Sequence, residues 1–191
     1  MSISPIPVHV LTGFLGSGKT TLLRKLLADP ALADTAVIIN EFGEVGLDHL
    51  LVRELSEDVV LLASGCVCCA LKDDLTATLA ELQHAAATGE IPHFDRVVLE
   101  TTGLADPLPI MRVLRLDARV TRHFALGQVA TTVDAVHGLH TLESYGEAVQ
   151  QIAASDCLIL TKTDVAAERD VQRLSQRLAS LNPTARRLTS G

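Results

Sequence analysis

The chain has 191 residues, of which 48% are hydrophobic and 20% charged, so we expect one folded domain over residues 1–191, and a disordered chain is excluded. The formal net charge of -7 argues against nucleic acid and anionic membrane surfaces as partners. No apolar run reaches the roughly 18 residues of a membrane span, and residues 1–7 do not resemble a secretory signal, so a cytoplasmic protein is predicted.

Short apolar runs rich in valine and isoleucine alternate with longer segments of helical period. This alternation predicts an α/β fold in which helices flank a mostly parallel central sheet. The predicted strands are residues 8–11, 36–40, 59–63, 97–100, 129–133 and 157–161, and the residues before Leu188 look like the start of another strand. The predicted helices are residues 19–28, 71–87, 108–114, 143–154 and 167–181.

Residues 13–20 read G-F-L-G-S-G-K-T, which matches G-x-x-x-x-G-K-[ST] between a predicted strand and a predicted helix. The match predicts a phosphate-binding loop and the three-layer P-loop NTPase fold, in which Lys19 neutralises phosphate oxygens and Thr20 holds Mg²⁺. A glycine-rich turn without a ligand is the weaker alternative. The predicted nucleotide contacts here are Gly13, Phe14, Leu15, Gly16, Ser17, Gly18, Lys19, Thr20 and Thr21.

A predicted strand ends at Glu100 and is followed by Thr-Thr and Gly103. At the carboxyl edge of a P-loop sheet, such an acid is expected to hold the Mg²⁺ or its water shell, and the N–H group of Gly103 is expected to meet the γ-phosphate. An acid at a strand end is by itself more often a capping or loop residue. The phosphate loop favours the functional interpretation.

The sequence T-K-T-D, from Thr161 through Lys162 to Asp164, follows the predicted strand 157–161. A carboxylate at Asp164 can accept two hydrogen bonds from the N1–H and the exocyclic amine of guanine, and the Lys162 stem can cover the base plane. Adenine lacks this donor pair, so GTP is favoured over ATP. A surface charge pair at a strand end is the common alternative.

Three of the four cysteines, Cys66, Cys68 and Cys69, form a C-x-C-C cluster between a predicted strand and a predicted helix. Such thiolates, completed by a carboxylate or imidazole from elsewhere, suit a soft divalent ion such as Zn²⁺. Redox cycling and simple packing remain open as alternatives.

The segment 41–56 is predicted to be a long loop between strands. We favour Glu44 as an additional ligand of the thiolate site and Glu41 as a residue that orients water, although solvated loop acids are an equally good account of each. His137 and His140 are interpreted as surface histidines.

The motifs G-F-L-G-S-G-K-T-T-L-L, N-E-F-G-E-V-G, G-C-V-C-C, E-T-T-G-L-A-D-P, V-D-A-V-H and T-K-T-D closely resemble those of CobW-like P-loop GTPases, relatives of the HypB and UreG nickel chaperones. They run in the family order from Gly13 to Asp164. The resemblance implies a GTP-driven metallochaperone for zinc or, in the cobalamin branch, cobalt, which passes its ion to a client metalloprotein.

By this resemblance, Cys66, Cys68 and Cys69 take the transferred ion, the phosphate loop holds GTP and Mg²⁺, Glu100 and Gly103 sense the γ-phosphate, and Lys162 and Asp164 read guanine. Thr161 stands where many GTPases have asparagine, so we expect a base loop that is less firmly tied. The resemblance also implies a smaller C-terminal α+β domain, which we expect to be missing from this chain.

We hypothesise that Mg²⁺ and GTP order residues 41–48 and draw the three thiols into a metal site, and that hydrolysis loosens the ion. Lys19, Glu41 and Glu100 are the candidate catalytic residues. Without an identifiable arginine finger, turnover is expected on the order of 10⁻⁴ to 10⁻² per second. A small-molecule kinase and a metal buffer or redox sensor with uncoupled nucleotide binding are the rival functions, and dimerisation of the nucleotide-bound form stays open.

Overall fold

The structure is a computed structural model that describes residues 4–39, 60–63 and 71–190. Its centre is a seven-stranded sheet in the order β3-β2-β4-β1-β5-β6-β7, and every neighbouring pair is parallel. The strands are β1 (Ile6–Thr12), β2 (Thr35–Ile39), β3 (Val60–Ala63), β4 (Arg96–Glu100), β5 (Phe124–Asp134), β6 (Cys157–Thr161) and β7 (Arg186–Thr189). The predicted parallel α/β sheet is confirmed.

The helices also follow the prediction closely, apart from two short elements, a 3-10 turn and a helix, that were not predicted. They are α1 (Lys19–Leu27), the 3-10 turn η1 (Pro30–Leu32), α3 (Leu71–Thr88), α4 (Leu108–Leu116), α5 (Gly138–Ser144), α6 (Gly146–Ala153) and α7 (Glu168–Leu181). The predicted helix 143–154 is α6, which begins later because Tyr145 has an extended backbone that separates it from α5. The short helix α5 was not predicted, since its seven residues start at a glycine.

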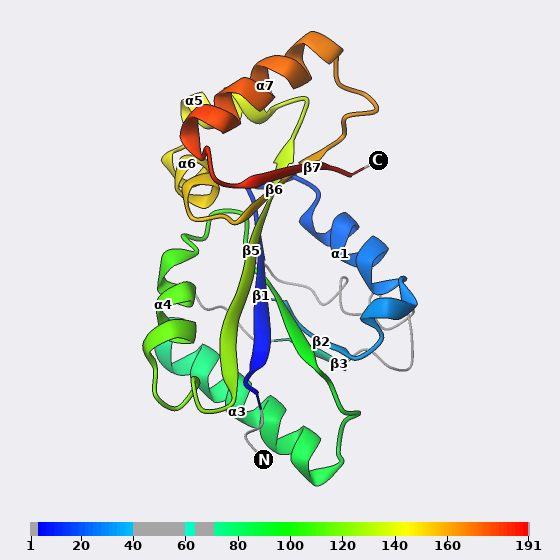
Figure 1. Cartoon of the computed structure of the whole chain (residues 1–191), viewed down its shortest axis with the longest axis vertical. Helices are drawn as coiled ribbons and strands as arrows, with labels where there is room; N and C mark the ends of the chain where they lie inside the picture. Colours follow the sequence, from blue (N-terminus) through cyan, green and yellow to red (C-terminus); the bar gives the residue numbers. More distant parts are fainter. Residues whose placement is uncertain (1–3, 40–59, 64–70, 191) are drawn as a thin grey trace.

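Alternate residues of the central strands face opposite layers of helices. Leu11, Val37 and Ile39 pack with Leu23 and Leu27 of α1, whereas the neighbouring strand residues face the other layer. That second layer contains α3 and α4 over one half of the sheet and α5, α6 and α7 over the other half (Figure 1). The described helices therefore form the outer two layers of a three-layer fold with the sheet between them.

The strand order determines where a ligand can bind. The central strand β1 lies between β4 and β5. Strands β2, β3 and β4 lie on one side of β1, and strands β5, β6 and β7 lie on the other side. In parallel sheets, ligands bind at the carboxyl edge near such a reversal of strand order. The loops after β1, β4, β5 and β6 all leave the sheet at this edge. In the part of the chain that the structure describes, no helix combines the length and apolar character of a membrane span.

Candidate nucleotide site

The phosphate loop joins β1 to α1 in a conformation that depends on glycine. Gly13, Gly16 and Gly18 have φ angles of 140°, 70° and 90°, which L side chains rarely adopt. Gly18 is the N-cap of α1, and no described side chain caps that helix start. The first N–H groups of α1 therefore face the carboxyl edge of the sheet, an arrangement that favours an anion.

The loop is tightly fastened to β5. A Cβ atom on Gly13 would lie 2.4 Å from the hydroxyl oxygen and 2.5 Å from the carbonyl oxygen of Thr132, so no side chain fits there. The hydroxyl groups of Ser17 and Thr132 are 2.7 Å apart and share a buried hydrogen bond. Thr132 has no sequence signal that would have identified it, because a threonine in a strand is ordinary.

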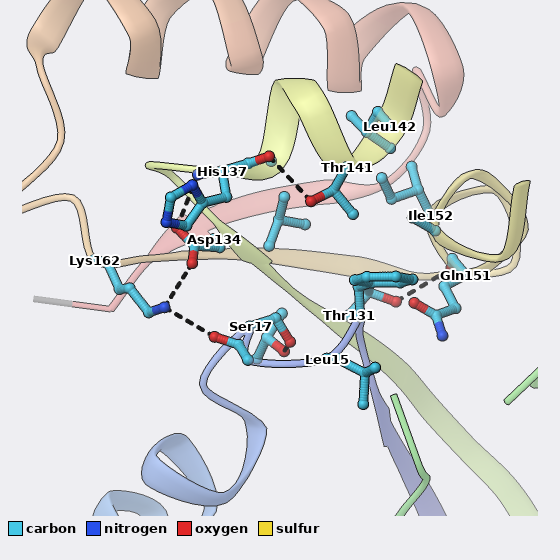
Figure 2. A pocket seen from close by; sticks show the side chains of 16 residues that line it. Leu15, Ser17, Thr131, Asp134, His137, Thr141, Leu142, Gln151, Ile152 and Lys162 are labelled. Carbon is cyan, nitrogen blue, oxygen red and sulfur yellow. Dashed lines mark hydrogen bonds and ion pairs between the residues drawn. The ribbon is translucent and has the colours of Figure 1, made fainter. Parts of the chain in front are cut away.

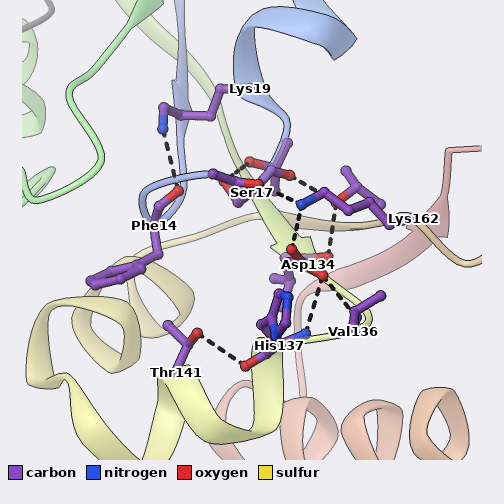
Figure 3. A network of polar contacts seen from close by, with 12 residues as sticks. Phe14, Ser17, Lys19, Asp134, Val136, His137, Thr141 and Lys162 are labelled. Atoms are coloured by element: carbon purple, nitrogen blue, oxygen red, sulfur yellow. Dashed lines mark hydrogen bonds and ion pairs between the residues drawn. The ribbon is translucent and has the colours of Figure 1, made fainter. Parts of the chain in front are cut away.

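Lys19 is buried and its ammonium group lies over the loop (Figure 3). It donates hydrogen bonds to the carbonyl oxygens of Gly13 at 3.0 Å and Phe14 at 3.4 Å. The positive charge is thus held within the loop in which the sequence predicts phosphate oxygens. Thr21, also predicted to contact nucleotide, is exposed in the first turn of α1.

Thr20 and Glu100 meet across the gap between α1 and β4. The Thr20 hydroxyl donates a 2.7 Å hydrogen bond to Oε1 of Glu100, whose side chain is buried. A hydroxyl and a carboxylate are the hard oxygen ligands that Mg²⁺ prefers. At the next residue, the Thr101 hydroxyl donates to that of Thr12 at 2.9 Å and fastens the end of β4 to β1 beside the pair.

The turn after β4 touches the phosphate loop. A Cβ atom on Gly103 would lie 2.6 Å from the backbone nitrogen of Leu15, so only glycine allows this approach. Gln151 of α6 donates from its Nε2 atom to the carbonyl oxygens of Gly103 and Ala105, each at 3.1 Å. Gln151 was not predicted as a site residue, since nothing in the helical pattern distinguishes it from a surface glutamine.

The base loop after β6, residues 161–164, is hydrogen-bonded to the phosphate loop at two points. The Thr161 hydroxyl donates to the Ser17 carbonyl at 2.7 Å, and Nζ of Lys162 donates to the Gly16 carbonyl at 2.9 Å. The loop is therefore fastened at the position where a looser connection was expected. Lys162 has a φ angle of 57°, a left-handed conformation that is uncommon outside glycine, and Asp164 is exposed two residues later.

Asp134, at the end of β5, organises this corner of the site (Figure 3). Its carboxylate accepts hydrogen bonds from Nζ of Lys162 at 2.5 Å and from the N–H groups of Val136 at 2.7 Å and His137 at 3.1 Å. Burial alone would raise the pKa of Asp134, but the bonds from Lys162 and from the two N–H groups hold it below the ordinary value of 3.8. The carboxylate is therefore charged at neutral pH and fixes the Lys162 side chain.

A cavity of about 270 Å³ lies beside the phosphate loop (Figure 2). Its walls are the loop itself, the end of β5 and helices α5 and α6. His137 and His140 are both exposed, as expected for surface histidines.

The predicted metal-site residues Glu41, Glu44, Cys66, Cys68 and Cys69 lie outside the described residues. Within the described ranges, no three His, Cys, Asp or Glu residues are grouped so that they could hold a metal ion. The fourth cysteine, Cys157, is a buried free thiol whose pKa is raised by burial.

Comparisons with known proteins agree with this architecture. Residues 7–189 match the family model described as the CobW/HypB/UreG nucleotide-binding domain. The chain is similar to the zinc chaperone YjiA of Escherichia coli, with 40% identity over 183 residues, which cover 96% of this chain and 57% of YjiA. It is also similar to the zinc-regulated GTPase metalloprotein activator 1 of Schizosaccharomyces pombe, with 34% identity over 192 residues, 97% of this chain and 46% of that protein.

Among solved structures, the Zn(II)-bound YjiA GTPase from E. coli superposes with a TM-score of 0.75 at 36% identity. That alignment covers 99% of this chain and 58% of the YjiA chain. The chain therefore spans about half the length of the relatives that it matches.

Proposed function

The chain belongs to the CobW/HypB/UreG family of nucleotide-binding domains, and from this premise we propose that it is a GTP-hydrolysing metallochaperone. Its cargo is zinc or cobalt, its nucleotide state sets its metal affinity, and the ion passes to a client metalloprotein. The proposal is supported by the names of its relatives, a zinc chaperone and a zinc-regulated GTPase metalloprotein activator.

The proposal that the chain binds a guanine nucleotide rests on the two hydrogen bonds between the base loop and the phosphate loop. Thr161 bonds to the carbonyl of Ser17 and Lys162 to that of Gly16, so the groups for the base and for the phosphates form one unit. A bound guanine nucleotide would contact both loops at once. Asp164 accepts the guanine N1–H and amine, and the stem of Lys162 covers the base.

The phosphates of the nucleotide would be bound by the phosphate loop and by the turn after β4. Lys19 neutralises the β- and γ-phosphate oxygens, and the N–H group of Gly103 meets the γ-phosphate. Thr20 and Glu100, already joined by a 2.7 Å hydrogen bond, are the residues that would hold Mg²⁺, which screens phosphate charge when bound. Water attacks the γ-phosphorus, the bond to the β-phosphate oxygen breaks, and GDP and inorganic phosphate leave.

The metal part rests on residues outside the described ranges. Cys66, Cys68 and Cys69 would bind the ion as thiolates with Glu44 as a further ligand, and Glu41 would orient the attacking water. We propose that GTP tightens this site and that hydrolysis is slow and releases the ion. Coupling is reciprocal, so the metal changes nucleotide affinity by the same factor.

The test is a competition titration of Zn²⁺ against a chromophoric chelator, with GTP and Mg²⁺ or with GDP and Mg²⁺. The triple variant Cys66→Ala, Cys68→Ala, Cys69→Ala should lose the site, and Cys157→Ala, which alters a thiol at the start of β6, should keep it. Clearly tighter zinc binding with GTP is expected. Equal affinity in both nucleotide states would contradict the gating and leave a metal-binding protein with two independent sites.

Nucleotide choice is tested separately. We expect GTP to displace a fluorescent guanine nucleotide and ATP to fail at the same concentration. Asp164→Ala should abolish this preference, and Asp170→Ala, on α7, should not. Preferential ATP binding would instead favour a P-loop kinase.

A further inference from the structure

Gln151 joins two parts of the molecule that the sequence does not connect. The side chain is fully buried on α6, and its Nε2 atom donates to the carbonyl oxygens of Gly103 and Ala105 at 3.1 Å each. Both carbonyls belong to the turn after β4. One amide group therefore holds two carbonyl groups of that turn against α6.

The same turn is pressed against the phosphate loop from the other side. The space where a Cβ atom of Gly103 would stand is occupied by the backbone nitrogen and Cα of Leu15, at 2.6 and 2.8 Å. The position of the Gly103 N–H group relative to the phosphate loop is thus fixed by contact on one face and by Gln151 on the other.

The backbone that carries Gln151 is itself anchored. Its carbonyl oxygen accepts hydrogen bonds from the hydroxyl groups of Ser155 at 2.7 Å and Thr131 of β5 at 3.1 Å. Asn182, at the end of α7, donates to the carbonyls of Ile152 and Ser155 at 2.8 Å. The amide group of Gln151 therefore projects from a rigid support, to which the turn is attached.

The acceptor end of the amide group differs from the donor end. Within the described structure, Oε1 of Gln151 is buried without a hydrogen-bond partner, and the side chain lines the cavity beside the phosphate loop (Figure 2). Burying an acceptor in this way is unfavourable, and an apolar residue of similar size would avoid it. The donor function toward Gly103 and Ala105 is the feature that an apolar residue could not supply.

We propose that Gln151 is a positioning residue for γ-phosphate recognition: it holds the turn of Gly103 so that the N–H group of Gly103 is aimed at the γ-phosphate. The proposal rests on the proposed GTP binding. GDP lacks the γ-phosphate, so Gln151 acts on the affinity for GTP and on hydrolysis and leaves GDP binding largely unchanged.

The test compares dissociation constants for GDP and for a non-hydrolysable GTP analogue, both with Mg²⁺, together with single-turnover hydrolysis of GTP. Gln151→Leu removes both hydrogen bonds and keeps the approximate size. Gln151→Glu keeps the shape and places a carboxylate against the two carbonyls. Gln150→Leu, at the exposed neighbouring position on α6, is the matched control. Thermal unfolding is recorded for each, and Gln151→Met, which also lacks the donor but has a more flexible side chain, serves if the Leu variant does not fold.

For Gln151→Leu we expect the affinity for the GTP analogue to fall about tenfold and the affinity for GDP to change less than about twofold, since two neutral hydrogen bonds are lost. Hydrolysis should slow, and Gln150→Leu should behave as the unaltered chain. An equal loss for both nucleotides, or no loss, would overturn the proposal. If the unaltered chain binds neither guanine nucleotide, the proposed function fails first, which distinguishes the two failures.

Discussion

Thr20 and Glu100 lie 80 positions apart in the sequence, yet the hydroxyl of one donates a 2.7 Å hydrogen bond to the carboxylate of the other. One residue stands in the first turn of α1 and the other at the last position of β4. The pair forms only because β4 is the neighbour of β1 in the sheet. Strand order therefore brings together two oxygen groups of the kind that Mg²⁺ prefers.

This pair predicts how nucleotide binding depends on Mg²⁺. Glu100→Gln retains an oxygen that can accept from Thr20 but removes the charge that favours the cation. We expect GTP affinity measured with Mg²⁺ to fall at least about tenfold, and affinity measured in EDTA to change little. Isothermal titration in both buffers is the measurement. Glu81→Gln, on the exposed face of α3, is the control. Equal losses in both buffers would rule out a role in holding Mg²⁺.

The glycines of the phosphate loop predict a stability difference. Gly13→Ala would force a Cβ atom to 2.4 Å from the Thr132 hydroxyl oxygen in addition to its unfavourable φ, whereas Gly89→Ala, with φ of 76°, meets nothing within 4 Å. We expect Gly89→Ala to lower the unfolding free energy by about 1 kcal/mol and Gly13→Ala by about 3 kcal/mol or more. Urea denaturation measures both. Similar losses would mean that the phosphate loop shifts away from Thr132 at little cost.

The base loop predicts that one hydroxyl group contributes to both stability and nucleotide affinity. Thr161→Val keeps the shape of the side chain but removes the hydrogen bond to the Ser17 carbonyl. We expect the unfolding free energy to fall by about 1 kcal/mol and the affinities for GTP and GDP to weaken together, because both use the base loop. Thr121→Val, at an exposed position, should change neither. Unaltered nucleotide affinity in Thr161→Val would show that the tie does not position the base loop.

Asp134 predicts a pH-dependent contribution to stability. Its pKa in the folded chain lies below the ordinary 3.8, so as pH falls the unfolded chain takes up the proton first. The stabilisation is fully present above about pH 5 and is lost as pH falls through the folded pKa. Asp134→Asn should cost less than about 1 kcal/mol at neutral pH, because the Lys162 partner is partly exposed.

The difference in unfolding free energy between the unaltered chain and Asp134→Asn is measured by urea denaturation from pH 7 to pH 3. This difference should become smaller only in the acid range. Asp29→Asn, which alters the carboxylate that accepts from the Ala31 N–H at the start of η1, is the control. If the difference in unfolding free energy stays constant down to pH 3, the charge of Asp134 does not contribute to stability.

The sheet and its helices could be predicted because their signals are local. Buried strands such as β2 and β6 are continuous apolar runs, and α1 follows a phosphate-loop pattern with fixed spacing. The strand β7 gave only a weak signal, since its four residues are all exposed and include two arginines. The helix α5 was not predicted because it is short and starts at glycine.

Candidate site residues could be proposed from the sequence where they belong to a motif, and not where tertiary packing brings them together. The motifs indicated Lys19, Glu100 and Lys162. Gln151 and Asp134 act through contacts with loops distant in sequence, and no spacing rule links a helix glutamine to the carbonyl of Gly103. Their partners are fixed only when α6 and the end of β5 are packed beside the phosphate loop.

The strand order also has a consequence for synthesis of the chain. β1 emerges early, but its described neighbours are β4 and β5, which begin only at Arg96 and Phe124. The apolar residues Val8 and Val10 therefore lack a partner strand until more than half of the chain has left the ribosome. Pairing between distant segments is slow and leaves such strands open to aggregation. We expect nascent chains that end before Asp134 to depend on chaperones and to lack a phosphate loop that can bind nucleotide.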